Sequence, residues 1–144
     1  MKVALIACSK RKREVPAKAR DLYQGNLFKK SLRLAELEKF PRIFILSAKY
    51  GLLELEQCIA PYDTTLLTQD RDQRQEWARG VIEQLRKQGI LEEELHYFAG
   101  RGYYQYLPEG VVRFSGSSMG EIDNHLQAQI NKLNRKGFKL CLKK

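Results

Sequence analysis

Four short polar segments each follow directly on an apolar run, and their residue types are those that hold phosphates and nucleotides. Small residues let a ligand approach the backbone, and a cation or hydroxyl beside them can bind an anion. The residues with this chemistry are Cys8, Ser9, Lys10 and Lys12; Ser47, Lys49, Tyr50 and Gly51; Gly100 and Arg101; and Ser115 and Ser117. We interpret the four segments as one ligand pocket. The alternative is that strand ends need turns, and turns favour Ser and Gly for their own geometry.

The elements that would position these segments can be read from the hydrophobic pattern. Apolar runs at 3–7, 43–46, 95–99 and 111–114 are short, β-branched or aromatic and mostly unalternated, as expected of strands buried on both faces. Between them, three- and four-residue spacing predicts helices at 26–40, from a cap at Asp70 to Gly89, and from about Met119 onward.

The alternation of strands and helices predicts a single α/β domain over residues 1–144, with three layers and a mostly parallel sheet of about four strands flanked by helices. The carboxyl ends of parallel strands meet at one edge, where open α/β sheets bind ligands. The four polar segments are therefore expected to lie together. Residues 51–69 are expected to form a long loop, which at this length is more often functional than not.

Three side chains are candidates for catalysis. Asp63 is the candidate carboxylate, although a turn residue bonded to its own backbone explains it equally well. Lys49 and Tyr50 directly follow a buried strand, so we expect their backbones to be fixed and their side chains to bind or stabilise charge. The basic run 10–13, in contrast, can stay solvated.

Two further features carry weaker signals. Cys8 beside lysines could be a nucleophile, but a small, largely buried structural cysteine is the favoured interpretation. The Ser- and Gly-rich segment 115–120 could bind an anion at the start of the last helix, although it lacks the spacing of a P-loop.

Charge and composition limit the function classes. Net charge is +9, with the basic excess in residues 1–50 and in a C-terminal tail at about 132–144, whereas 51–131 is net acidic. Basic surfaces attract phosphates, nucleic acid or acidic partners, or are simply solvated. Three dispersed cysteines and two histidines argue against a disulfide framework or a metal site, and no apolar run is long enough for a signal peptide or membrane span. We expect a cytoplasmic protein that needs no cofactor and does not bind membranes.

The segment 45–53, ILSAKYGLL, followed by IAPYD at 59–63, resembles the "LSxxYGLL…I.PY" signature of the YaaA-like proteins. The opening IACSKRK, with ARDLY and LF behind it, is similar to a shorter, uncharacterised group of bacterial and phage proteins within or near that family. A related module accompanies enzymes that make 7-deazaguanine-type base modifications. The stretches cover most of residues 1–66, and 99–104 extends them weakly.

The resemblance implies an α/β domain associated with nucleic acid or modified bases, in DNA or RNA modification or a stress response. The site positions it carries over are Ser9, Lys10, Ser47, Tyr50, Gly51, Pro61, Tyr62 and Asp63.

Two functions remain open. The first is a module that binds nucleic acid or a phosphorylated nucleotide or base. The second is an enzyme acting on a nucleobase or N-glycosidic bond, with Asp63, Lys49 and Tyr50 as catalytic residues. A protein-interaction domain with a vestigial pocket is the plainest alternative, and the oligomeric state is left open.

Overall fold

The computed structural model describes residues 1–142 and shows a sheet in the order β4-β3-β1-β6-β7. Its strands are β1 (Lys2–Ala7), β3 (Arg42–Ser47), β4 (Gly51–Glu54), β6 (Glu94–Phe98) and β7 (Val111–Val112). The pairs β1–β3, β1–β6 and β6–β7 are parallel, and only β3–β4 is antiparallel. The α/β class and the mostly parallel sheet are thus confirmed, with five strands in place of about four.

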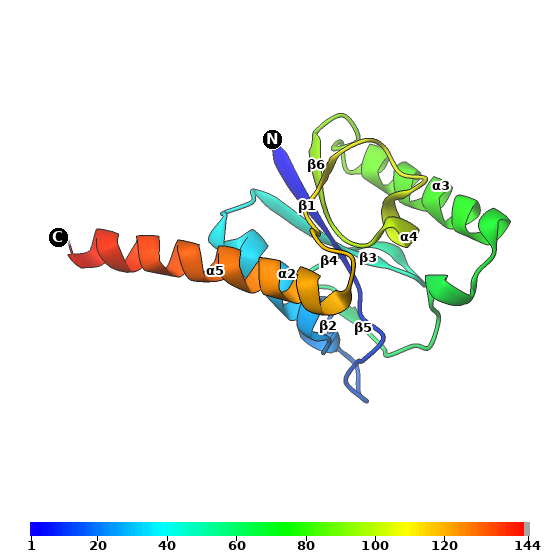
Figure 1. Cartoon of the computed structure of the whole chain (residues 1–144). Coiled ribbons are helices and arrows are strands. Elements are labelled where there is room, and N and C mark those ends of the chain that lie inside the picture. The colour runs from blue at the N-terminus through cyan, green and yellow to red at the C-terminus, as the bar shows by residue number, and fades with distance from the viewer. Residues whose placement is uncertain (143–144) are drawn as a thin grey trace.

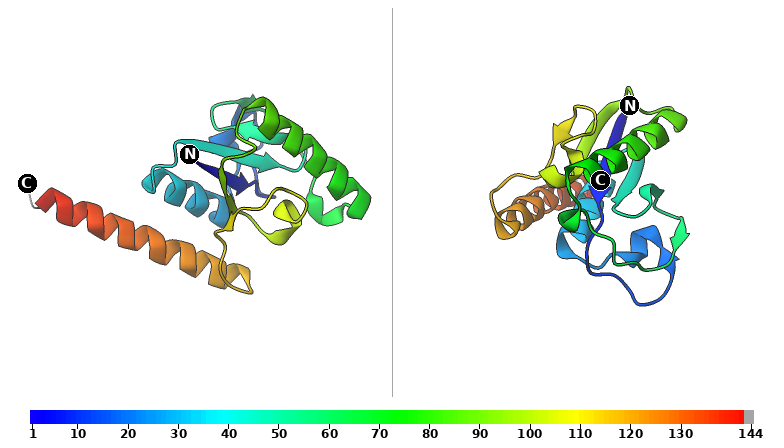
Figure 2. Two further views of the ribbon diagram at one scale, coloured as in Figure 1. Left: turned by 90° about the horizontal axis from the view of Figure 1, so that it is seen from above. Right: turned by 90° about the vertical axis from the view of Figure 1, so that its right-hand side faces the viewer.

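Helices cover both faces of this sheet (Figure 1, Figure 2). α2 (Asn26–Leu37) and α5 (Met119–Leu142) pack together on one face, and α3 (Arg71–Lys87) packs on the other. The shorter helices are α1 (Ala19–Leu22), η1 (Leu66–Thr68) and α4 (Arg101–Tyr104). Asp70 caps α3 through a reciprocal bond with Gln73, and Gly89 ends it with a φ of 72°, as the sequence predicts.

Side chains alternate between the two faces even where the sequence shows no alternation. Ala4 and Ile6 of β1 point into the core under α2 and α5, whereas Val3 and Leu5 point into the core under α3. All four are fully buried. A strand covered on both faces needs apolar residues at every position, which is why the run 3–7 is uninterrupted.

The expectation of a long loop at 51–69 is wrong. Residues 51–54 form β4, which turns back along β3 in a tight hairpin, and β5 (Cys58–Ile59) pairs with β2 (Ala17–Lys18) in a separate two-stranded sheet. Gly51 permits the hairpin because it adopts a φ of 74°, in the left-handed region. A strand of four residues is too short to show a period.

The last helix absorbs most of the predicted basic tail. Residues 132–142 continue α5, which extends beyond the sheet (Figure 1), and residues 143 and 144 lie outside the described part of the chain. Lys132, Arg135 and Lys136 are exposed on this helix. Within residues 1–142, no helix is both long and apolar enough to cross a membrane.

Candidate functional site

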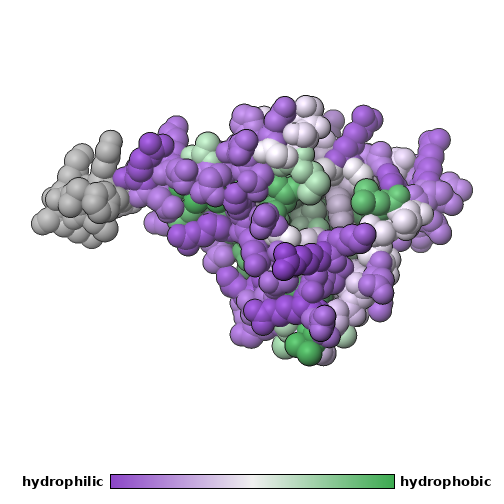
Figure 3. Space-filling view, turned by 60° about the horizontal axis from the view of Figure 1, so that its bottom comes forward, coloured by the Kyte–Doolittle hydropathy of each residue, from purple (hydrophilic) through white to green (hydrophobic). Residues whose placement is uncertain are grey.

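A cavity of about 940 Å³ opens at the carboxyl edge of the parallel strands. It is lined by the loop after β1 (7–12), the first turn of α2 (25–28), residues 63–65 and 67, Gly100, Tyr103, Phe114 and the start of α5 (119, 120, 122 and 123). A space-filling view with this end of the molecule turned forward shows apolar surface near the centre, bordered by hydrophilic side chains (Figure 3). The volume is in the range of pockets that hold small ligands.

The loop after β1 is fixed by Ser9. Its Oγ donates to the carbonyl of Arg11 at 2.8 Å and accepts the amide of Gly25 at 3.1 Å. Gly25 has no room for a side chain, because an added Cβ would lie 2.7 Å from the Cβ of Ser9. These contacts hold the loop against the start of α2, so two parts of the cavity wall are joined.

Lys12 is the cation that the fold positions in this cavity. Its Nζ donates to the carbonyl of Lys10 at 3.1 Å and lies 4.4 Å from the ring centre of Tyr62 and 5.8 Å from that of Tyr23. Burial lowers the pKa of Lys12 below its ordinary value, with Cys8 and Asp63 acting in the opposite direction. The ammonium has therefore lost part of its water and stands to gain from an anionic partner. Lys10, Arg11 and Arg13 are exposed, so only part of the basic run 10–13 is solvated as expected.

Beneath Lys12 runs a chain of buried hydroxyls. The Oγ of Ser47 lies 2.7 Å from the hydroxyl of Tyr62, which lies 2.6 Å from that of Tyr23. The amides of Lys49 and Tyr50 both donate to Ser47 Oγ. Because these amides occupy its lone pairs, Ser47 donates its proton to Tyr62, and Tyr62 donates to Tyr23.

Burial dominates the acid–base behaviour of these phenols. It raises the pKa of Tyr23 to about 12, and it also raises the pKa of Tyr62 above its ordinary value. Both tyrosines are therefore neutral in the physiological range. The chain fixes the turn after β3 and provides the aromatic faces on which Lys12 rests.

Cys8, at the start of the loop after β1, contacts α4. Its Sγ lies 3.4 Å from the hydroxyl of Tyr103, and burial raises the pKa of Tyr103 above its ordinary value. Cys8 is half-buried and packs on the core, which fits the structural role favoured by the sequence. Tyr103 ends the polar segment 100–103 that follows β6, although only Gly100 and Arg101 of that segment were predicted as site residues.

The predicted site residues fall into two groups. Cys8, Ser9, Lys10, Lys12, Asp63 and Gly100 line the cavity, whereas Ser47, Lys49, Tyr50, Gly51, Tyr62, Arg101, Ser115 and Ser117 are not part of its lining. The backbones of Lys49 and Tyr50 are fixed as expected. Their side chains are exposed, and the Tyr50 ring packs edge-on against that of Tyr62 at 5.6 Å between ring centres. Arg101 lines a second hollow.

Ser115 and Ser117 are exposed, and the segment that contains them caps its own helix. Ser118 Oγ accepts the amide of Glu121, and the Glu121 carboxylate accepts both the amide and the hydroxyl of Ser117. These bonds lower the pKa of Glu121, the backbone bond most. An internal carboxylate thus occupies the position where an anion was expected.

The start of α2 is the part of the site that the sequence analysis missed. Within the part of the chain that the structure describes, no side chain caps α2 and no acidic residue lies in its first turn. Asn26, Leu27 and Phe28 line the cavity, and their amides are at the positive end of the helix. The signal in the sequence was Gly25, since Gly is one of the accepted N-cap residues, but it is a weak one.

The fold and cavity define an α/β protein with a ligand-sized site at the carboxyl edge of its sheet. The chain belongs to a family of unknown function (DUF6884), whose model matches residues 3–128. This range contains every segment that lines the cavity. No curated protein and no solved structure matches the chain.

Proposed function

We propose that the protein binds a nucleotide, free or as part of a nucleic acid, in the large cavity. The observation that carries this proposal is the pairing of two unlike walls in one cavity. Leu27, Phe28, Phe114 and Ile122 form an apolar wall, and Lys12 with the loop after β1 forms a cationic one. A nucleotide has the matching parts, a flat base and a phosphate.

The phosphate would lie between Lys12 and the start of α2. Lys12 is partly desolvated over Tyr62, so that its interaction with an anion is less screened than that of a surface lysine. The free amides of the first turn of α2 add hydrogen-bond donors and the positive end of the helix dipole. The base would then rest on the apolar wall.

Two properties of the sequence support the same proposal. The basic excess of residues 1–50 includes Lys10, Arg11 and Lys12, which line the cavity. The similarity of 45–53 and 59–63 to the YaaA-like signature implies a role with nucleic acid or modified bases. A relationship to the YaaA-like proteins is itself part of the proposal.

Calorimetry with nucleosides and their 5′-monophosphates tests the proposal. We expect the monophosphates to bind more tightly than the nucleosides, and Lys12→Met to weaken the monophosphates by about 10- to 100-fold, as for a lost charged hydrogen bond. Lys87→Met is the matched control, because Lys87 lies in the last turn of α3, just before β6 begins at the opposite edge of the sheet. The proposal fails if no monophosphate binds at low salt, or if both variants weaken binding equally.

A second candidate function is hydrolysis of an N-glycosidic bond, in which water replaces the base on the sugar carbon. Asp63 favours it, since the structure brings this carboxylate to the same cavity as Lys12. Asp63 would serve as general base for the water. The assay measures release of free base from nucleosides. Release that is lost in Asp63→Asn, while nucleoside binding persists, would support a hydrolytic enzyme. Binding without release supports a nucleotide-binding module.

A further inference from the structure

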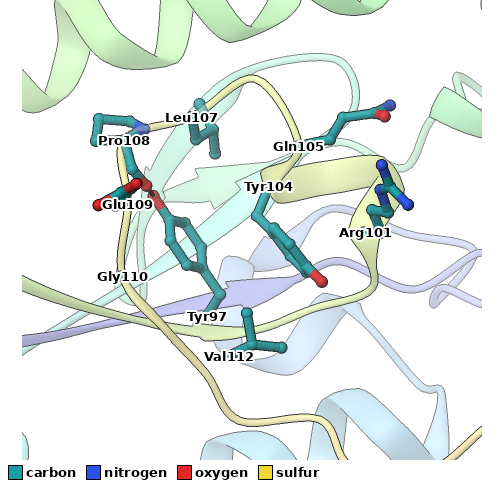
Figure 4. Close-up of a pocket in the computed structure, with 9 residues that line it drawn as sticks. All are labelled: Tyr97, Arg101, Tyr104, Gln105, Leu107, Pro108, Glu109, Gly110 and Val112. Carbon is teal, nitrogen blue, oxygen red and sulfur yellow. Dashed lines mark hydrogen bonds between the residues drawn. The ribbon is translucent and has the colours of Figure 1, made fainter.

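A second hollow, of about 470 Å³, lies beside the large cavity and shares a wall with it. Figure 4 shows the side chains that line it. In this view Tyr97, Tyr104 and Arg101 lie in a row across the hollow, and Val112 lies below them. The wall between the two is α4, a single helical turn. Gly100 and Tyr103 face the large cavity, whereas Arg101 and Tyr104 line the small one.

The small hollow is held in shape by Tyr97. This buried residue donates its hydroxyl to the carbonyl of Pro108 at 2.6 Å and lies 5.6 Å from the ring of Tyr104, at an angle of 32°. Gly110 passes so close to the carbonyl of Leu95 and the ring of Tyr97 that a Cβ would collide with both. The loop that forms the outer wall is therefore tied to the sheet.

The chemistry of the small hollow is that of a stacking platform. Tyr104 is half-buried and lines the hollow with an aromatic ring, Val112 is exposed and apolar, and Arg101 is exposed at one end. Aromatic faces with an adjacent arginine bind unpaired bases and their phosphates. Glu109 lies at the other end of the hollow from Arg101 (Figure 4), and its charge repels a phosphate there. A phosphate is thus directed to the Arg101 end.

We propose that the natural ligand is a single-stranded nucleic acid with consecutive nucleotides in the two hollows and the linking phosphate over α4, next to Arg101. The proposal rests on nucleotide binding in the large cavity and extends it. One nucleotide occupies the site beside Lys12, and the base of its neighbour stacks on Tyr104. A base held in a hollow cannot be paired, so duplex is excluded from this mode.

The experiment compares thymidine 5′-monophosphate, the dinucleotide pTpT, an eight-residue oligothymidylate and the same oligomer in a duplex, by calorimetry at one low salt concentration. We expect pTpT to bind about 10-fold more tightly than the monophosphate, as for one base stacked on an aromatic ring. Arg101→Ala and Tyr104→Leu should each abolish most of this gain and leave the monophosphate unchanged. The same series in uridylates shows whether RNA is bound as well as DNA.

Arg79→Ala is the matched control for loss of one positive charge, because Arg79 is exposed on α3 and lines neither hollow. In Arg79→Ala, pTpT should still bind about 10-fold more tightly than the monophosphate. The inference is overturned if pTpT binds no more tightly than the monophosphate, if the gain survives in both α4 variants, or if duplex binds more tightly than single strand. The effect of Lys12→Met on the monophosphate reports on the large cavity, because Lys12 does not line the small hollow. The outcomes above therefore leave nucleotide binding in the large cavity intact. Failure of that binding is seen separately, as a monophosphate affinity that Lys12→Met does not change.

Discussion

Two helices begin at the large cavity, and their first turns are built in different ways. α5 follows a Ser- and Gly-rich segment, and Glu121 with Ser117 and Ser118 satisfies its first turn from within. α2 follows Gly25 and has neither a side-chain cap nor an acid in its first turn within the described chain. The segment before α5 is the richer of the two in small polar residues, but the carboxylate of Glu121 already neutralises the start of that helix. The start of α2, which lines the same cavity as Lys12, has no such internal anion.

The largest effect is expected where α2 begins. Gly25→Ala places a methyl group 2.7 Å from Ser9 Cβ, and the loop after β1 must shift to admit it. We expect a loss of about 2 to 3 kcal/mol in the free energy of unfolding, as for overpacking of a filled site. Chemical denaturation measures this.

Gly80→Ala is the control for that substitution. Gly80 lies within α3 and nothing lies within 4 Å of its added Cβ, so the change should stabilise the protein by about 0.5 to 1 kcal/mol. Equal effects at the two glycines would show that α2 does not start in close contact with the β1 loop.

The second effect concerns the support of Lys12. Tyr62→Phe keeps the ring under the ammonium but removes the hydroxyl between Ser47 and Tyr23, which leaves a buried donor without its acceptor. We expect a loss of about 1 to 2 kcal/mol in unfolding free energy. Nucleotide affinity should change little, because the ring remains. A large loss of affinity with unchanged stability would instead place the hydroxyl in contact with ligand.

The sequence predicted which strands end at the cavity better than it predicted which side chains line the cavity. β1, β3 and β6 follow from apolar runs that must be buried on both faces, and parallel pairing then brings their carboxyl ends together. Lys12 and Lys49 look alike in the sequence, since each lies in a polar segment after a strand. In the structure Lys12 lines the cavity, whereas Lys49 lies in the hairpin turn between β3 and β4 and does not.

The signature residues illustrate the same limit. The signature predicts Ser47 and Tyr62 as site positions, and Ser47 is also predicted from its place after a strand. The structure places both in a buried hydroxyl chain outside the cavity lining. A motif records that residues are needed together and does not distinguish ligand contact from support. Cys8, Ser9, Lys10, Lys12 and Gly100 follow predicted strands, and they line the cavity as strand order predicts. Asp63, a candidate carboxylate from the segment 51–69, lines it as well.

The third prediction concerns an acidic residue in the first turn of α2, comparable to Glu121 in the first turn of α5. Asn26→Asp adds a carboxylate to the first turn of α2, at the cavity. It should stabilise the helix slightly and weaken a 5′-monophosphate by about 3- to 5-fold, because it opposes the phosphate at the positive end of the helix. Asn131→Asp, on the exposed side of α5, makes the same charge change outside the cavity and should not alter affinity. If both variants weaken binding alike, net charge and not the start of α2 governs the ligand.

The smallest effect is expected when α5 loses its internal anion. The folded-state pKa of Glu121 is lowered by its bonds from Ser117, so its stabilising effect is present above the unfolded-state pKa and is lost as pH falls through the folded-state value. In Glu121→Gln that contribution is missing throughout. The thermal midpoints of the variant and the parent protein should therefore differ slightly near neutral pH and converge between about pH 5 and pH 3. Since Glu121 is exposed and does not line the cavity, nucleotide affinity should stay the same. A gain in affinity would show that the carboxylate competes with ligand, and that the two helix starts act on one anion.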